Sequence, residues 1–100
     1  MGWADLYIQK LKAGQTVSFR PSGNSMTGRI ESGQLCWVEP VVKENIKVGD
    51  AVLCKVNGKQ YLHLVKAIND SRVLIGNNKG FNNGWTSFNC VYGKLIKVED

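Results

Sequence analysis

Two side chains, Ser25 and His63, are of the types that could act on a substrate together. Ser25 follows the turn-forming residues 21–24 (Pro-Ser-Gly-Asn), and His63 is the only histidine of the chain. A serine hydroxyl is a weak nucleophile until a base within hydrogen-bond reach takes its proton. Histidine suits that task near neutrality, because its reference pKa is about 6.5. Taken singly, a serine in a turn and a histidine in an apolar strand are more often structural.

The strand that would carry His63 is one half of a hairpin with a clear turn signal. Residues 51–56 and 59–67 are rich in β-forming side chains and flank Asn57-Gly58. This dipeptide is the strongest short signal for a two-residue β-turn. Such a turn places Val52 opposite His63.

Alternation along this strand decides which side chains share a face with His63. Tyr61, His63 and Val65 are expected on one face, and Lys66 on the other. Lys59 has the same parity as His63 but lies about 13 Å away along the strand. Neither lysine is therefore placed to replace His63 as a base.

Short strands separated by turn residues predict a mainly β, antiparallel fold with one short N-terminal helix. Apolar residues at helical spacing begin at Trp3 and end before Ala13-Gly14, so residues 1–13 are expected to contain the helix. Residues 15–98 would form the β body of a single domain, 1–100. Residues 76–89 are rich in glycine and asparagine and are expected to be a loop, either merely solvated or in contact with substrate. Strands are expected at residues 16–19, 34–42, 51–56, 59–67, 72–75 and 91–98.

Composition narrows the classes of function. The formal net charge is +5, but the basic residues are scattered, so nucleic-acid binding is the weakest option. The three cysteines form no Cys-x-x-Cys unit, which argues against a disulfide framework and a zinc site and suits a reducing compartment. The N-terminus has no long apolar run, so neither a signal peptide nor a transmembrane helix is predicted. We expect a cytoplasmic domain with no metal, no cofactor and no membrane anchor.

Several motifs, taken in order, resemble the peptidase domain shared by LexA-type repressors and type I signal peptidases. Ser-Gly-Asn-Ser-Met at residues 22–26 is similar to the turn that presents the nucleophilic serine of that family. Each motif is weak alone, but their order and spacing are fairly specific, and the resemblance covers residues 15–98. It implies the compact β fold of the LexA C-terminal domain and of signal peptidases. The further matches are Ile-Glu-Ser-Gly-Gln at 30–34, Ile-Lys-Val-Gly-Asp-Ala-Val at 46–52, Tyr-Leu-His-Leu-Val at 61–65, Ile-Gly-Asn-Asn at 75–78 and Val-Tyr-Gly-Lys-Leu at 91–95.

This resemblance implies catalytic roles for Ser25 as nucleophile and His63 as general base. LexA-type members carry lysine at the second position, whereas histidine there is similar to the endoplasmic-reticulum and archaeal signal peptidases. Asn77 stands where those enzymes have an acidic residue. It would orient the imidazole by hydrogen bonding without adding a charge.

The resemblance also implies how a substrate would be held. The backbone amides of Asn24 and Ser25 would form the oxyanion hole. Met26 and Tyr61 would bind the substrate, which would be a peptide or protein. Any homodimer would pair through the C-terminal strand, residues 91–98, because LexA-type domains pair near that strand and an exposed edge invites pairing.

Departures from the family pattern leave two functions open. Thr27-Gly28 stand where a proline is common, and Asn82 and Asn83 occupy two further positions that are acidic in signal peptidases. One function is a compact serine peptidase that hydrolyses or self-processes peptide bonds through a Ser25–His63 dyad. The alternative is a catalytically inactive relative that acts as a protein-interaction module.

Overall fold

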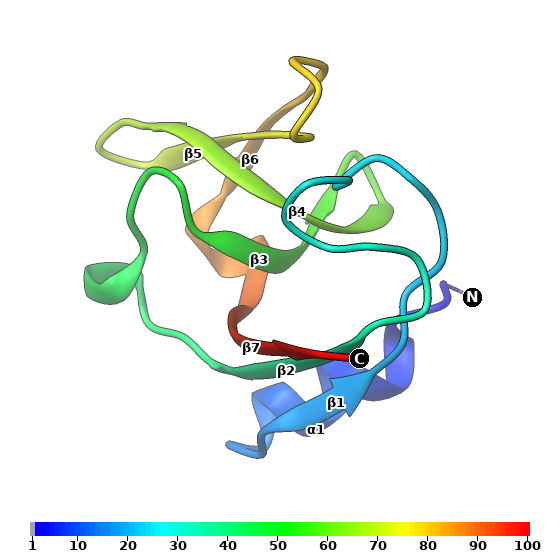
Figure 1. The fold of residues 1–100 in the computed structure, drawn as a ribbon. Helices are drawn as coiled ribbons and strands as arrows, with labels where there is room; N and C mark the ends of the chain where they lie inside the picture. The colour runs from blue at the N-terminus through cyan, green and yellow to red at the C-terminus, as the bar shows by residue number, and fades with distance from the viewer. Residues whose placement is uncertain (1) are drawn as a thin grey trace.

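Seven strands form one antiparallel sheet in the computed structural model, which describes residues 2–100 (Figure 1). One α-helix precedes the strands in this range, so the prediction of a mainly β fold with one short N-terminal helix is confirmed. Met1, part of the expected helical segment 1–13, lies outside the described residues. Within 2–100, no helix is long and apolar enough to cross a membrane. The elements are α1 (Asp5–Lys12), β1 (Val17–Phe19), β2 (Leu35–Pro40), η1 (Lys43–Asn45), β3 (Ala51–Val56), β4 (Lys59–Ile68), β5 (Arg72–Gly76), β6 (Asn82–Ser87), η2 (Phe88–Cys90) and β7 (Val91–Glu99).

The sheet order is β1-β2-β7-β3-β4-β5-β6, which places the last strand inside the sheet. β7 pairs with β2 from Gly93 to Glu99 and with β3 from Val91 to Lys94. The expectation that the C-terminal strand is an edge strand of the sheet is therefore wrong, whereas the pairing of a homodimer through residues 91–98 stays a prediction. Neighbouring strands already take both of its edges at Gly93 and Lys94, and β1 and β6 are the edge strands of the sheet.

The hairpin of β3 and β4 has the predicted turn and register. Val56 pairs with Lys59, and Val52 pairs with His63. Asn57 (φ 51°) and Gly58 (φ 82°) both have positive φ, as a type I′ turn requires. This turn matches the right-handed twist of the strands, and it confirms the placement of His63 opposite Val52.

Two hydrophobic clusters lie on opposite faces of this hairpin. Leu62 and Leu64 belong to the cluster that packs against α1, β1 and β2. Tyr61 and Val65 belong to the cluster that lies toward β5 and β7. β3 contributes buried side chains to both clusters, so the alternation predicted for the hairpin is confirmed and the hairpin is a rigid support for His63.

Close packing at Gly93 holds α1 against the sheet. A Cβ at this position would lie 2.6 Å from Cγ1 of Val38 and 2.9 Å from Cδ1 of Leu11. Such distances are too short for real Cβ atoms, so only glycine allows the helix, β2 and β7 to approach this closely. The Gly-Lys motif of the C-terminal strand is thus explained by packing.

The expected loop at residues 76–89 contains a strand. β6 pairs with β5, with Val73 opposite Thr86 and Gly76 opposite Asn82. Thr86 is buried, and its hydroxyl donates a hydrogen bond of 2.7 Å to the carbonyl oxygen of Lys55. Asparagine and glycine have low strand propensity, but pairing with β5 and packing against β3 override it. The loop expectation was wrong for residues 82–87.

Candidate active site

Ser25 lies in a tight turn between β1 and β2. The N–H of Ile30 donates a hydrogen bond of 2.8 Å to the carbonyl oxygen of Met26, and Arg29 donates to the same oxygen at 2.9 Å. Met26 and Ile30 are 5% and 4% exposed and anchor the turn in the core. Ser25, immediately before Met26, remains exposed. The local sequence therefore buries one side of the turn and presents the serine on the other.

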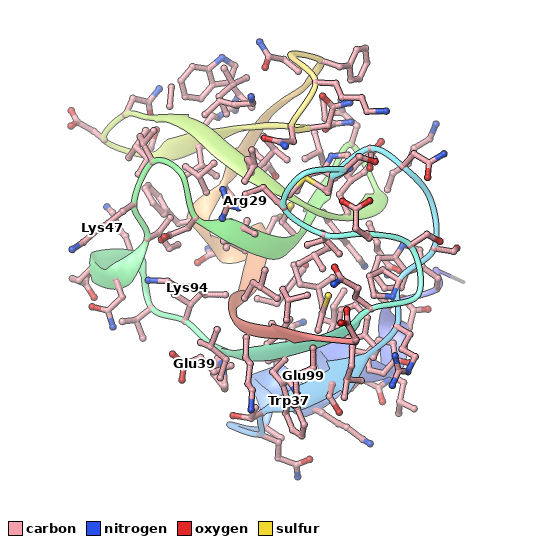
Figure 2. All side chains as sticks on the ribbon, in the orientation of Figure 1. Arg29, Trp37, Glu39, Lys47, Lys94 and Glu99 are labelled. Carbon is pink, nitrogen blue, oxygen red and sulfur yellow. The ribbon has the colours of Figure 1, made fainter. Side chains whose placement is uncertain are left out.

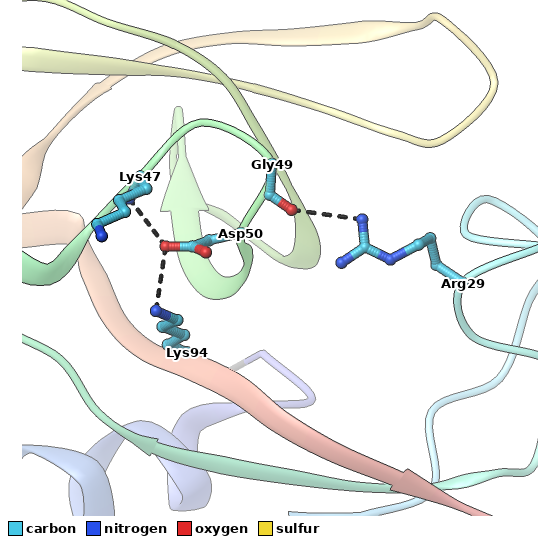
Figure 3. Close-up of polar contacts among 5 residues, drawn as sticks. All are labelled: Arg29, Lys47, Gly49, Asp50 and Lys94. Carbon is cyan, nitrogen blue, oxygen red and sulfur yellow. Dashed lines mark hydrogen bonds and ion pairs between the residues drawn. The ribbon is translucent and has the colours of Figure 1, made fainter.

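Two other loops tie this turn down. The N–H of Asn78 donates to the carbonyl oxygen of Ser25 at 3.1 Å, and its side-chain amide donates to the carbonyl oxygen of Thr27 at 2.8 Å. Arg29 Nη1 donates to the carbonyl oxygen of Gly49 at 3.3 Å, and Figure 3 shows this link from the turn to the residues before β3. One set of these hydrogen bonds comes from the loop after β5, and the other reaches the residues before β3. Together they hold the Ser25 turn in a fixed position relative to β4, which carries His63.

Ser25 and His63 are in hydrogen-bond contact. Ser25 Oγ lies 3.0 Å from His63 Nε2, and His63 Nδ1 lies 2.7 Å from Asn83 Oδ1. A carbonyl oxygen has no proton to give, so Nδ1 must carry the proton and donate it to Asn83. Nε2 is then unprotonated and accepts from the Ser25 hydroxyl. This is the tautomer that a general base requires.

The surroundings of His63 keep the imidazole neutral. Burial lowers the pKa of His63 from its ordinary value of 6.5, because a charged ring loses hydration in this position. The hydrogen bond to Asn83 opposes this shift but is the smaller effect on the pKa. The Tyr61 ring packs beside the imidazole at 4.9 Å between centroids. At neutral pH the ring is available to accept a proton.

The amide in contact with His63 Nδ1 is that of Asn83, whereas the sequence had suggested Asn77. The Oδ1 atom of Asn77 accepts hydrogen bonds from the N–H groups of Lys79 (2.8 Å) and Phe81 (3.0 Å), so it holds the β5–β6 loop. Asn83 reaches His63 because β6 folds back along β5 and toward β3. The sequence held a signal for this contact, since the expected family pattern places an acidic residue at position 83. The Asn78 tether gave no comparable signal.

The remaining expected site residues lie around Ser25. The carbonyl oxygen of Asn24 accepts from Thr27 Oγ1 at 2.8 Å and from its N–H at 3.3 Å, so Asn24 begins the turn. Met26 is mostly buried and presents only a small surface, whereas Tyr61 is half-buried beside His63. Met26 and Tyr61 both line the cleft described next. Asn24 does not line it.

A cleft of about 670 Å³ contains both members of the Ser25–His63 pair. Its volume is in the range of pockets that hold small molecules or a few peptide residues. Its walls come from α1, β1, the Ser25 turn and β4. The lining residues are Trp3, Tyr7, Phe19, Arg20, Pro21, Ser22, Gly23, Ser25, Met26, Ile30, Glu31, Gln60, Tyr61, Leu62 and His63.

The Gly-Asp motif before β3 has a structural explanation. Asp50 Oδ2 accepts a hydrogen bond of 2.8 Å from the N–H of Lys47 and lies 3.5 Å from Lys94 Nζ (Figure 3). The carboxylate closes the turn at Gly49 and links it to β7. Both ring nitrogens of His63 have other partners, Ser25 and Asn83, and the Asp50 carboxylate contacts neither nitrogen.

Comparison with known proteins identifies the family of the chain. The family model described as Peptidase S24-like matches residues 4–89, which include Ser25, His63 and Asn83. No curated protein and no solved structure matches the chain. Because the family model spans most of the chain, the protein belongs to the Peptidase S24-like family.

Proposed function

We propose that the protein is a serine peptidase that hydrolyses or self-processes peptide bonds, with Ser25 as nucleophile and His63 as general base. The observation that carries the proposal is the 3.0 Å contact between Ser25 Oγ and His63 Nε2, inside a cleft that is open to a peptide. Burial lowers the pKa of His63, which supports a neutral base at physiological pH. Membership of the peptidase family supports peptides as the substrate class.

The chemistry proceeds in two steps. Ser25 Oγ attacks the carbonyl carbon of the peptide while its proton moves to His63 Nε2, and the imidazolium then protonates the leaving amine. This leaves an ester on Ser25 and a neutral imidazole. His63 next takes a proton from water, hydroxide attacks the ester, and the proton returns to Ser25. The N–H groups of Asn24 and Ser25 are proposed to stabilise the oxyanion in both steps.

Asn83 gives the site the correct geometry but no counter-charge. In Ser-His-Asp peptidases, replacing the aspartate with asparagine lowers kcat by about 10⁴-fold because the wrong imidazole tautomer results. Here the amide oxygen faces Nδ1 at 2.7 Å, so the tautomer is right. What is lost is the electrostatic stabilisation of the imidazolium. Slow turnover is the expected consequence.

The missing charge is also the one observation that favours the alternative function, a catalytically inactive protein-interaction module. In that case the cleft binds a peptide segment of a partner without cutting it. The Ser25–His63 contact argues against this alternative, because binding alone requires neither the free hydroxyl nor the matched tautomer. The two functions differ in one measurable property, the reactivity of Ser25.

The test is covalent labelling by a fluorophosphonate probe, read by intact mass, together with cleavage of a peptide library. The proposal expects one label on the wild type, none on Ser25→Ala, and full labelling of the control Ser22→Ala, whose serine also lines the cleft. His63→Ala should cut peptides about 10²- to 10⁴-fold more slowly. The double variant should be no slower than Ser25→Ala, because the pair acts as a unit.

The opposite outcome is equally clear. If the wild type takes up no more label than Ser25→Ala and cuts no library peptide faster, the peptidase proposal fails. Binding of the same peptides by the unreactive wild type would then support the interaction module.

A further inference from the structure

We propose that three aromatic side chains at one end of the cleft form a subsite for a large apolar side chain of the peptide substrate. The aromatic cluster consists of Trp3, Tyr7 and Phe19, contributed by the N-terminal segment, α1 and β1. The inference rests on the proposed function, since it names the substrate class of the same cleft. In Figure 1 these elements lie on the opposite side of the sheet's β2 and β7 pair from β5 and β6.

The rings of the aromatic cluster pack against one another, with Phe19 buried at 6% exposure beneath the partly exposed Tyr7 and the exposed Trp3. Tyr7 and Phe19 are stacked, with centroids 4.5 Å apart and planes at 22°. Trp3 packs edge-on against Phe19 at 5.5 Å and lies 6.4 Å from Tyr7. Rings in mutual contact hold one another in place, so the surface that they offer is rigid.

Trp3 is exposed although it is fixed in position. Its side chain is 52% exposed, and its Nε1 donates a hydrogen bond of 3.2 Å to the carbonyl oxygen of Gln60. Gln60 Oε1 also accepts from the N–H of Ala4 at 2.7 Å, and its amide donates to Asp5. A half-exposed indole held by a hydrogen bond loses little freedom when a ligand covers it, which favours binding.

Anchoring of the helix does not explain the exposure of Trp3. Ala4, Ile8 and Leu11 are 0%, 5% and 3% exposed and already attach α1 to the core. Gly93 accepts the helix closely at Leu11. The indole faces the cleft and adds apolar surface that the helix does not need for its own packing.

The charged side chains of the cleft are already engaged within the protein. Arg20 Nη1 donates to the carbonyl oxygen of Gly33 at 2.8 Å, and Glu31 Oε2 accepts from the N–H of Gly28 at 2.8 Å. They have opposite signs and lie in the same lining. The pair therefore favours neither sign of substrate charge, and the rings supply the apolar contact.

The position of the subsite relative to the cut bond follows from β4. Trp3 is bonded to Gln60, three residues before His63 on the same strand. A strand rises about 3.3 Å per residue, so the aromatic cluster lies about 10 Å from the dyad. An extended peptide along the cleft spans that distance with about three residues. The geometry thus sets the apolar side chain about three residues from the scissile bond.

The experiment measures binding to the Ser25→Ala protein, so that cleavage does not interfere. The probes are short, fluorescein-labelled peptides of alanine and serine in which one position at a time is phenylalanine. Binding is followed by fluorescence anisotropy. We expect one position to bind about tenfold more tightly than the others, and Trp3→Ala to abolish this preference. Trp3→Phe keeps a ring in place and should retain part of it.

Two matched controls come from outside the cleft. Leu6 is 58% exposed on the same helix, and Trp85 is a 42% exposed tryptophan on β6. Leu6→Ala and Trp85→Ala should leave the phenylalanine preference unchanged. Equal affinity for all peptides, or the same loss in either control, overturns the subsite. If Trp3→Ala lowers the thermal unfolding midpoint well below that of the Ser25→Ala protein, the subsite is tested by the peptide series and by Trp3→Phe instead.

The subsite and the peptidase proposal fail in different ways. If the wild type cuts peptides but the Ser25→Ala protein shows no preferred position, the subsite is wrong and the peptidase stands. If the preference is present but the wild type neither cuts nor reacts with the fluorophosphonate, the peptidase is wrong and the aromatic end binds peptides of an uncut partner.

Discussion

The amide of Asn83 determines what the imidazole of His63 can do. Its oxygen accepts the Nδ1 proton at 2.7 Å and so directs the basic Nε2 atom toward Ser25. An amide stabilises the protonated ring much less than a carboxylate does. The residue therefore provides position without charge, and changing this one atom type separates the two contributions.

Asn83→Asp should speed cleavage and shift its pH dependence. The added carboxylate raises the pKa of His63 by favouring the charged ring. Because only the neutral ring accepts a proton, the acidic limb of kcat/KM should move to higher pH. Above that limb, kcat should rise by about tenfold or more, since the charge stabilises the imidazolium that forms in the transition state. A pH series of cleavage rates measures both effects.

Asn77→Asp is the matched control for this change. A carboxylate at position 77 still accepts the two backbone N–H groups that Asn77 Oδ1 now accepts, so the loop is preserved. Its effect on the acidic limb should be the smaller of the two. A larger shift in Asn77→Asp than in Asn83→Asp would contradict the assignment of Asn83 as the positioning residue.

His63 should also make folding stability depend on pH. Burial lowers the folded-state pKa of the imidazole below the unfolded value near 6.5, so the unfolded chain binds the proton first. The stabilising contribution is present above pH 6.5 and is lost as the pH falls through the folded pKa. Urea unfolding between about pH 7 and pH 5 should show this decline, and His63→Gln should reduce it.

The decline in stability between about pH 7 and pH 5 can be assigned to His63 for two reasons. The chain has no other histidine. The pKa of Asp5 is lowered, first by its hydrogen bond to Gln60, so its own contribution is lost only at more acidic pH. An identical pH dependence in wild type and His63→Gln would show that the imidazole is not buried as described.

At the scale of elements, the site is a turn, a hairpin and a strand from distant parts of the chain. The Ser25 turn is held by its own buried side chains and by Asn78 in the β5–β6 loop. The hairpin supplies His63, and β6 supplies Asn83. The geometry of the proposed site therefore depends on contacts between elements as much as on Ser25 and His63 themselves.

Asn78→Ala should lower kcat more than it raises KM. The change removes the 2.8 Å hydrogen bond to the carbonyl oxygen of Thr27 while keeping the backbone bond to Ser25. Loss of such a bond costs about 1 kcal/mol of stability. A looser turn misplaces Ser25 Oγ, and we expect kcat to fall about tenfold, because small misplacements are costly in catalysis. Asn89→Ala, an exposed asparagine of η2, is the control. Equal kinetics in both variants would exclude the positioning role.

Local signals explain what the sequence predicted about these elements. Asn57-Gly58 specifies its own turn, and the two-residue alternation then places His63 on the correct face without knowledge of the rest of the fold. The turn before Ser25 was predicted from the turn-forming residues 21–24, whereas the Ser-Met motif was found by its resemblance to a family. β6 was missed because its strand state depends on β5 and β3, not on its own Asn and Gly residues. Asn77 was predicted to contact His63 in place of Asn83 for the same reason. Without a strand at 82–87, no residue of that segment could be placed against His63.

At the scale of the whole molecule, β7 joins the two parts of the sheet. It lies between β2 and β3 and contributes Val91 to one hydrophobic cluster and Leu95 and Val98 to the other. Figure 2 shows Trp37 and Glu99 where β2 and β7 run side by side, and Trp37 Nε1 donates to Glu99 Oε1 at 2.6 Å. Ser25 lies in the connection between β1 and β2, and His63 lies in the hairpin of β3 and β4. The strand that joins the two parts of the sheet thus also sets the distance between Ser25 and His63.

Removal of the chain after Gly93 should therefore abolish the fold. The truncation takes from β2 its paired residues Lys94 to Glu99, and it leaves the apolar side chains around Cys36 and Val38 open to water. The loss of several ladder hydrogen bonds together with partly buried Leu95 and Val98 is of the same order as the roughly 5–15 kcal/mol that stabilises a typical domain. Circular dichroism and urea unfolding should show no cooperative transition, and Ser25 should no longer react with the fluorophosphonate.

Removal of Asp100 alone is the control for this experiment. That residue is exposed, and its one side-chain hydrogen bond runs to Gln34 at the surface. The shortened protein should unfold cooperatively near the wild-type midpoint and keep its reactivity. A truncation after Gly93 that still folds would mean that β2 finds another partner, either in the same chain or in a second copy. Its mass in solution separates these outcomes: a dimer would show that the C-terminal strand normally occupies a surface able to pair with another protomer, and a folded monomer would contradict the central role of β7.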